Sequence, residues 1–205
     1  MINTRYLEPS EFIDFDHPEV ARKATELAAG RQADEDVAER CFEFVRDEVK
    51  HSWDFELGPV TCRASDVLIH GTGYCYAKSH LLAALLRANR ISAGLCYQRL
   101  SVDGNGPPFS LHGLNAVFLK RYGWYRIDAR GNKPGVEAAF CPPVEKLAFP
   151  IANQEEADLP EIWAEPLSIV VKLLTDNATV EQVYRNLPDV DLVRPSRPSR
   201  QTSGS

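Results

Sequence analysis

The chain has 205 residues, of which 44% are hydrophobic, and this is enough to bury one sizeable core. Its net charge of −6 disfavours binding to nucleic acid. The sequence contains no run of about 18 apolar residues, so we expect no transmembrane helix and no membrane partner.

The cysteines indicate a reducing environment. There are five, an odd number at irregular spacings, which favours free thiols over a disulfide framework. No C-x-x-C pair is present, so a structural zinc site is not expected. The first residues lack the basic-then-apolar order of a signal peptide. We therefore expect a cytoplasmic protein that uses no metal and no other cofactor.

Helices are predicted to come first along the chain. Asp16 or His17 caps the first helix and Gly30 stops it. Asp34 caps the second helix, whose apolar residues recur at helical spacing as far as Val49. A short helical turn and a third long helix follow, and one more helix closes the chain. The last three are predicted at residues 65–68, about 74–89 and 179–187.

Strands are predicted after the third helix. Val, Leu and aromatic runs bounded by turn residues favour strands over residues 93–100, 111–119, 124–128 and 168–174. The proline-punctuated stretch 134–166 is predicted to be irregular. Helices first and strands later indicate an α+β fold in one domain over residues 1–193. The Pro- and Ser-rich residues 194–205 are predicted to form a disordered tail.

One cysteine has an unusual setting, in the sequence GTGYCYAKSHLL (71–82). Cys75 follows two glycines that permit a sharp turn, and it lies at the start of the third helix. Free N–H groups and the positive end of the helix dipole converge there, and this field stabilises a thiolate. Cys41, by contrast, lies on the apolar stripe of the second helix. A nucleophilic and a packing role both remain open for Cys75 on local sequence alone.

A thiolate nucleophile needs an imidazole nearby, and five histidines are available. His80 lies about 140° around the helix from Cys75 and cannot easily reach it. His17 is expected to be a helix cap and His51 a helix-end residue. His70 precedes the glycine turn but has no evident carboxylate to orient it.

His112 is the remaining candidate, because it lies near the start of strand 111–119 and the next strand ends at Asp128. The two residues differ by an even number, so they share a face of the hairpin when its loop has an odd length. Direct opposition would centre the hairpin on Lys120, whereas a two-residue loop would separate the pair. In the first arrangement Asp128 can orient the imidazole toward Cys75, as in a Cys-His-Asp triad.

Four segments together resemble the core of the transglutaminase-like superfamily, relatives of the papain-type cysteine proteases. They are FVRDEVKHSWD, VLIHGTGYCYAKSHLLAALLRANRIS, LHGLNAVFL and GWYRIDARGN. They give the order Gly-x-Gly-x-Cys at a helix start, a histidine opening a strand, and Trp-x-x-x-Asp closing the next. The resemblance covers about residues 45–132. It implies a papain-like α+β fold in which the nucleophile helix packs, with the N-terminal helices, on an antiparallel sheet.

The resemblance implies that Cys75 is the nucleophile, His112 the general base and acid, and Asp128 its orienting carboxylate. The expected reaction is acyl transfer from a peptide or other amide-containing substrate through a thioester, ending in hydrolysis. Three alternatives stay open: a transamidating transglutaminase, an enzyme like the arylamine acetyltransferases, and an inactive peptide-binding module. The oligomeric state is not predicted.

The chain also departs from the family pattern. Arg90 stands where the family commonly has glycine, so we expect Asn89 to end the third helix in a left-handed conformation. Trp53 lies near a usually aromatic position and is expected to pack or to line the acyl site. Asp54 and Glu56 are expected to be solvated. The chain is small beside the calcium-regulated animal transglutaminases, so calcium dependence is not carried over, and without a C-x-x-C pair it differs from peptide:N-glycanase relatives.

Overall fold

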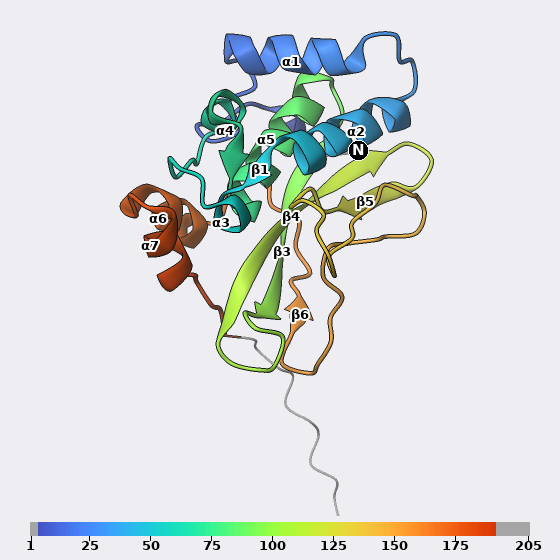
Figure 1. Cartoon of the computed structure of the whole chain (residues 1–205). Coiled ribbons are helices and arrows are strands. Elements are labelled where there is room, and N and C mark those ends of the chain that lie inside the picture. The colour runs from blue at the N-terminus through green and yellow to red at the C-terminus, as the bar shows by residue number, and fades with distance from the viewer. Residues whose placement is uncertain (1–3, 192–205) are drawn as a thin grey trace, which may run out of the picture.

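The computed structural model describes residues 4–191, so the predicted tail 194–205 lies outside the described residues. Helices fill most of its first half, and two more close the chain (Figure 1). They are the 3₁₀ helix η1 (Thr4–Leu7), α1 (Pro18–Ala28), α2 (Asp34–Glu43), the π-helical turn η2 (Phe44–Glu48), α3 (Ser52–Phe55), α4 (Ala64–His70), α5 (Cys75–Ala88), α6 (Ser168–Asp176) and α7 (Val180–Arg185).

The strands form two sheets. The larger is antiparallel with the order β5-β4-β3-β6, and the smaller is the parallel pair β1-β2. Their bounds are β1 (Lys50–His51), β2 (Thr72–Gly73), β3 (Ala93–Ser101), β4 (Phe109–Leu119), β5 (Gly123–Ile127) and β6 (Ala157–Asp158). The predicted irregular stretch 134–166 is confirmed, because β6 is its one strand.

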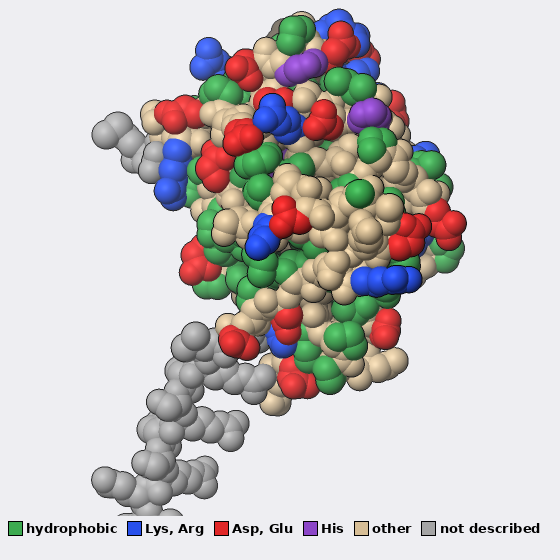
Figure 2. All heavy atoms as spheres, turned by 90° about the vertical axis from the view of Figure 1, so that its left-hand side faces the viewer, with side chains coloured by type: hydrophobic (Ala, Val, Ile, Leu, Met, Phe, Trp, Pro, Cys, Tyr) green, Lys and Arg blue, Asp and Glu red, His purple; other side chains and the backbone are tan. Residues whose placement is uncertain are grey.

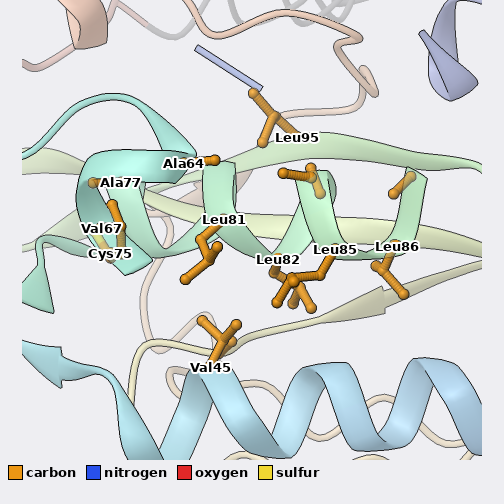
Figure 3. Close-up of a cluster of buried hydrophobic side chains, with 14 of the residues drawn as sticks. Val45, Ala64, Val67, Cys75, Ala77, Leu81, Leu82, Leu85, Leu86 and Leu95 are labelled. Carbon is orange, nitrogen blue, oxygen red and sulfur yellow. The ribbon is translucent and has the colours of Figure 1, made fainter. Parts of the chain in front are cut away.

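Helix α5 is the centre of the core. Every residue from Cys75 to Arg87 is buried, as expected of a helix that is covered on all sides. It packs on β3 and β4, and α1, α2 and α4 surround it. In Figure 3 a row of leucines on α5, including Leu81 and Leu85, points toward Val45 on the neighbouring helix. This packing confirms the predicted α+β class with the α5 helix on an antiparallel sheet.

The prediction of a strand at 168–174 is wrong, because this segment is α6. The run Ile-Val-Val favours a strand by propensity, but propensity is a weak guide beside tertiary packing. Val170, Leu173 and Leu174 are buried at helical spacing, and this shared face holds the helix against the core.

The predicted end of α5 is also wrong in detail. Asn89 has φ −88°, and the left-handed residue is Arg90, with φ +61°. The Ile91 N–H donates to the Leu86 carbonyl at 3.0 Å, which closes the last turn in the manner of a Schellman motif. Arg90 therefore adopts the backbone conformation that suits a glycine at this position.

The β4–β5 hairpin does not place His112 directly opposite Asp128, because its centre is shifted by one residue from the expected position. Leu119 pairs with Gly123 and Asn115 with Ile127, so the hairpin is centred on Arg121 rather than Lys120. The loop has an odd length, as the shared-face arrangement requires. Asp128, just past the end of β5, is consequently a diagonal neighbour of the position of His112 rather than its direct partner.

Among residues 4–191, no helix is both long and apolar enough to cross a membrane. On the face that looks left in Figure 1, acidic and basic side chains are interspersed, and neither sign forms a continuous patch (Figure 2).

Candidate active site

Cys75 is the first residue of α5 and lies at one end of the helix (Figure 3), two residues after the end of β2. No side chain caps this helix, whose preceding residue, Tyr74, is extended. The helix N-terminus therefore offers its backbone N–H groups and its dipole to whatever lies beside Cys75. The side chain of Cys75 is buried but lines a cavity.

Cys75 contacts the edge of β4 at Gly113, in the part of β4 that does not pair with β5. The Gly113 N–H points away from β3 and lies 3.5 Å from the Cys75 sulfur. A side chain at 113 would not fit, because a Cβ there would lie 2.9 Å from the Tyr76 ring and 3.1 Å from the Tyr76 Cα. The glycine thus allows the first turn of α5 to approach the strand.

His112 and Asp128 are brought together by this hairpin. The His112 Nε2 lies 2.7 Å from the Asp128 Oδ2, and both side chains are buried. The backbone N–H groups of Arg130 and Ala148 each donate to the Asp128 carboxylate at 3.1 Å. The His112 ring stands edge-on to Phe149, with centroids 5.0 Å apart. Because Asp128 takes Nε2, Nδ1 is the nitrogen left for Cys75.

The electrostatics of the pair favour its charged form. Burial opposes a charge on Asp128, but His112 and the two backbone donors outweigh it and hold the pKa of this carboxyl below its usual range. Burial likewise lowers the pKa of His112, but the charges and hydrogen bonds of Asp128 and Cys75 outweigh it and raise the pKa to about 10. His112 is therefore an imidazolium at neutral pH, ready to donate a proton.

A cavity of about 430 Å³ opens beside these groups. Aromatic side chains form part of its walls, and one wall is the stacked pair Trp53 and Tyr184, whose centroids are 3.9 Å apart. Trp53 thus both packs and lines the site. The other lining residues include His51, Tyr74, Cys75, Tyr76, Leu100, Ser101, Leu111, His112, Arg130, Lys133, Phe149, Pro150, Glu156 and Leu187.

A charged cluster that the sequence interpretation missed borders the same cavity. His51, expected to be a helix-end residue, is only 6% exposed and faces Asp54, with the Nδ1 3.6 Å from the Oδ2. Asp54 is not solvated, because Arg130 binds it through both terminal nitrogens and Lys133 binds it at 2.7 Å. Glu56 is exposed, as expected. The spacing His-x-x-Asp in HSWD was the local signal for this cluster.

Lys78, one turn after Cys75, was not singled out from the sequence either. It is wholly buried, and its Nζ donates to the Val49 carbonyl at 2.6 Å. Burial, with Arg130 acting in the same direction, lowers its pKa to about 7 against the pull of Asp128 and Asp47. Lys78 thus joins α5 to the residue that directly precedes β1, the strand of His51.

The other histidines lie elsewhere. His80 is buried with its Nδ1 2.7 Å from the Cys62 carbonyl and does not line the cavity, in agreement with the expectation that it does not reach Cys75. The prediction that His17 caps α1 is confirmed by the bond from the Glu19 N–H. Within residues 4–191, no group of three or more His, Cys, Asp or Glu side chains is arranged to hold a metal ion.

A cysteine thus opens the central helix of an α+β core, and a His-Asp pair follows on the adjoining hairpin. The sequence profile of the transglutaminase-like superfamily matches residues 21–129. This match spans just over half of the chain, and the protein belongs to the transglutaminase-like superfamily.

Three solved bacterial structures are similar to part of this chain. A proposed cysteine protease from Cytophaga hutchinsonii is 19% identical, with a TM-score of 0.48, and the match covers 61% of this chain and 40% of that one. The periplasmic domain of TgpA from Pseudomonas aeruginosa is 19% identical, with a TM-score of 0.44 over 62% and 46% of the two chains. A proposed protease from Parabacteroides distasonis is 12% identical, with a TM-score of 0.43 over 72% and 30%. The match thus spans less than half the length of each of these proteins. No curated protein sequence matches this chain.

Proposed function

We propose that the protein is a cysteine-dependent acyl-transfer enzyme that hydrolyses an amide bond. Cys75 is the nucleophile, His112 the acid and base, and Asp128 the carboxylate that orients His112. The substrate is a peptide or another amide-containing molecule. The expectation of a cytoplasmic location, which rests on the cysteine pattern, belongs to the same proposal.

The observation that carries the proposal is the buried His112–Asp128 pair beside the sulfur at a helix start. The pair is 2.7 Å apart, and the neighbouring Gly113 N–H lies 3.5 Å from the Cys75 sulfur. A structural histidine would be satisfied by the carboxylate alone. Here Cys75 also acts on His112 and raises its pKa together with Asp128, so the imidazole meets the sulfur as well as the carboxylate.

The first half of the reaction then follows from the geometry. The Cys75 thiolate attacks the amide carbonyl, and the C–S bond forms as the carbonyl oxygen takes up negative charge. The backbone N–H at the start of α5 stabilises that oxygen. His112 gives its proton to the leaving nitrogen, the C–N bond breaks, and a thioester remains on Cys75.

Alkylation by iodoacetamide at pH 6 tests the activated thiolate. Cys141 is the demanding control, because it is the exposed cysteine, whereas Cys41, Cys62, Cys75 and Cys96 are buried. We expect peptide mapping to find Cys75 modified first despite its burial. If Cys141 reacts as fast as Cys75, the proposed nucleophile is wrong. A Cys75→Ala variant should lose both the rapid labelling and any amide hydrolysis.

A further inference from the structure

An acidic side chain faces the cavity that contains Cys75. Glu156 is only 8% exposed, and among the lining residues within 4–191 it is the one aspartate or glutamate. It directly precedes β6, which lies beyond β3 at the edge of the larger sheet. The proposed function gives this side chain no role.

Main-chain groups hold the Glu156 carboxylate in the cavity wall. Its Oε1 accepts the Ser101 N–H at 3.0 Å, and its Oε2 accepts the Ala152 N–H at 2.7 Å. A carboxylate offers about four acceptor positions, so each oxygen keeps one for a further donor. The two hydrogen bonds therefore fix the carboxylate and leave it able to bind another group.

The basic side chains that line the cavity already face carboxylates of their own. Within the described residues they are His51, His112, Arg130 and Lys133. Asp128 pairs with His112, and Asp54 faces the other three. No basic side chain in residues 4–191 forms an ion pair with Glu156. Glu156 is thus a buried acid that lacks a counter-charge, and a buried charge is costly until an opposite charge compensates it.

The sheet register places Glu156 within reach of a substrate held at Cys75. Gln98 on β3 pairs with His112 on one side and with Asp158 on the other. Glu156 lies two residues before Asp158, and this spacing returns it to the face of the sheet that carries His112. Strand spacing and rise put the main chain at positions 112 and 156 about 12 Å apart. Because both side chains line the cavity, about two residues of extended chain can join the reacting carbonyl to a group on Glu156.

We propose that Glu156 determines specificity by binding a positively charged group of the substrate, a role that rests on the proposed function. The substrate class is a peptide or other amide that carries an ammonium or guanidinium group near the scissile bond. This cation donates to the free acceptor positions of the carboxylate and supplies the missing counter-charge. Hydrogen bonds between charged groups are stronger than neutral ones, so the pair can select the substrate.

Tripeptide amides of aminomethylcoumarin test this preference by fluorescence. One position at a time carries lysine, norleucine or glutamate, and the other positions carry alanine, so the cation is tried at each distance from the scissile bond. Lysine and norleucine have similar side-chain lengths, so the ratio of their kcat/KM values measures the effect of the charge. We expect the wild type to favour lysine over norleucine by about 10- to 100-fold at one position, and to cleave the glutamate peptide slowest there.

The variants Glu156→Gln and Glu156→Asp separate charge from structure. The glutamine nitrogen cannot accept an N–H, so Glu156→Gln loses one main-chain bond and should slow the cleavage of every peptide. Its lysine preference should vanish, whereas Glu156→Asp should keep a weaker preference. A purely structural role would lower kcat/KM for lysine and norleucine peptides by the same factor. The matched control, Glu155→Gln, removes the same charge at an exposed neighbour outside the cavity wall and should keep the wild-type preference.

The possible failures are distinguishable. If the wild type cleaves no peptide faster than Cys75→Ala does, the proposed function itself fails. If peptides are cleaved without a preference for lysine, or if the preference survives in Glu156→Gln, the proposed function stands and the role of Glu156 is wrong. A preference for glutamate would also overturn this role and would assign recognition to Arg130 and Lys133.

Discussion

The backbone N–H of Gly113 lies 3.5 Å from the sulfur of Cys75, so a strand edge and a helix start meet with no side chain between them. The contact exists because β5 ends at Ile127, opposite Asn115, and leaves the next part of the β4 edge open. It fixes the sulfur directly beside the residue that follows His112.

Replacing Gly113 with alanine should separate the helix from the strand. The new Cβ would lie 3.1 Å from the Tyr76 Cα, and main chain cannot yield as a flexible side chain does. A displacement below about 1 Å is enough to cost 10- to 100-fold in kcat/KM for amide hydrolysis. Circular dichroism should show a folded protein, and Gly113→Val should be worse than Gly113→Ala. Full activity in the alanine variant would mean that the 3.5 Å contact is not needed.

Asp128→Asn should leave the fold intact but remove the charge that holds His112 protonated. By comparison with other triads we expect kcat to fall about 10³- to 10⁴-fold. In the wild type the pKa of His112 is raised to about 10, so the imidazolium that protonates the leaving nitrogen persists and kcat/KM for amide hydrolysis should not decline between pH 7 and 9. In the variant the imidazolium is lost at lower pH, and kcat/KM should decline within that range. A level profile in Asp128→Asn would contradict the role given to the carboxylate.

Lys78→Met should change how stability depends on pH. The pKa of Lys78 is about 7 in the folded protein and about 10.4 in an unfolded chain. Between these values the unfolded state binds the extra proton, so Lys78 makes the protein more stable as pH rises, by about 2 kcal/mol from pH 7 to 9. Urea unfolding of the methionine variant at several pH values should lack this contribution.

The contribution of Lys78 is obtained by subtracting the free energy of unfolding of Lys78→Met from that of the wild type at each pH. The subtraction is needed because His112 changes the stability with pH in the opposite direction. Its pKa is raised in the folded state, so its stabilisation is complete below about pH 6.5 and is lost as pH rises toward 10. Lys172→Met, at an exposed lysine on α6, is the matched control and should follow the wild type. If Lys78→Met also runs parallel to the wild type, Lys78 titrates normally.

Arg90→Gly should stabilise the protein. Arg90 is exposed and has φ +61°, a region that costs a residue with a Cβ about 1 kcal/mol. Glu56, also exposed and at φ +51°, offers a second test of the same effect. Asn89→Gly should instead destabilise the protein, because the Asn89 side chain donates to the Ala24 and Leu85 carbonyls and the variant loses both hydrogen bonds. Chemical denaturation should give opposite signs for Arg90→Gly and Asn89→Gly.

What could be predicted from the sequence was local. The helix start at Cys75 follows from two glycines and a helical apolar pattern, and the strands on either side of Arg121 follow from their residue types. The register of that hairpin depends on loop length to a single residue, which turn composition does not define. The segment of α6 was predicted as a strand for a different reason: its helical form depends on burial against residues that are distant in sequence.

The groups that were missed share one property: they meet only in the folded chain. His51 and Asp54 belong to the segment before α4, whereas Arg130 and Lys133 follow β5. Each looks like an ordinary surface residue in its own stretch of sequence. Lys78 looks like a polar break in an apolar helix, and only the approach of the Val49 carbonyl gives its amine a buried partner.

The segment shared with the superfamily ends at residue 129, yet part of the cavity wall comes from later in the chain. Cys75, His112 and Asp128 lie inside that segment. Phe149, Glu156, Tyr184 and Leu187 lie outside it. The proposed triad thus lies within the shared segment, whereas the cavity wall is completed by residues beyond it. Substitutions in the C-terminal third can therefore reshape the cavity while Cys75, His112 and Asp128 keep their positions.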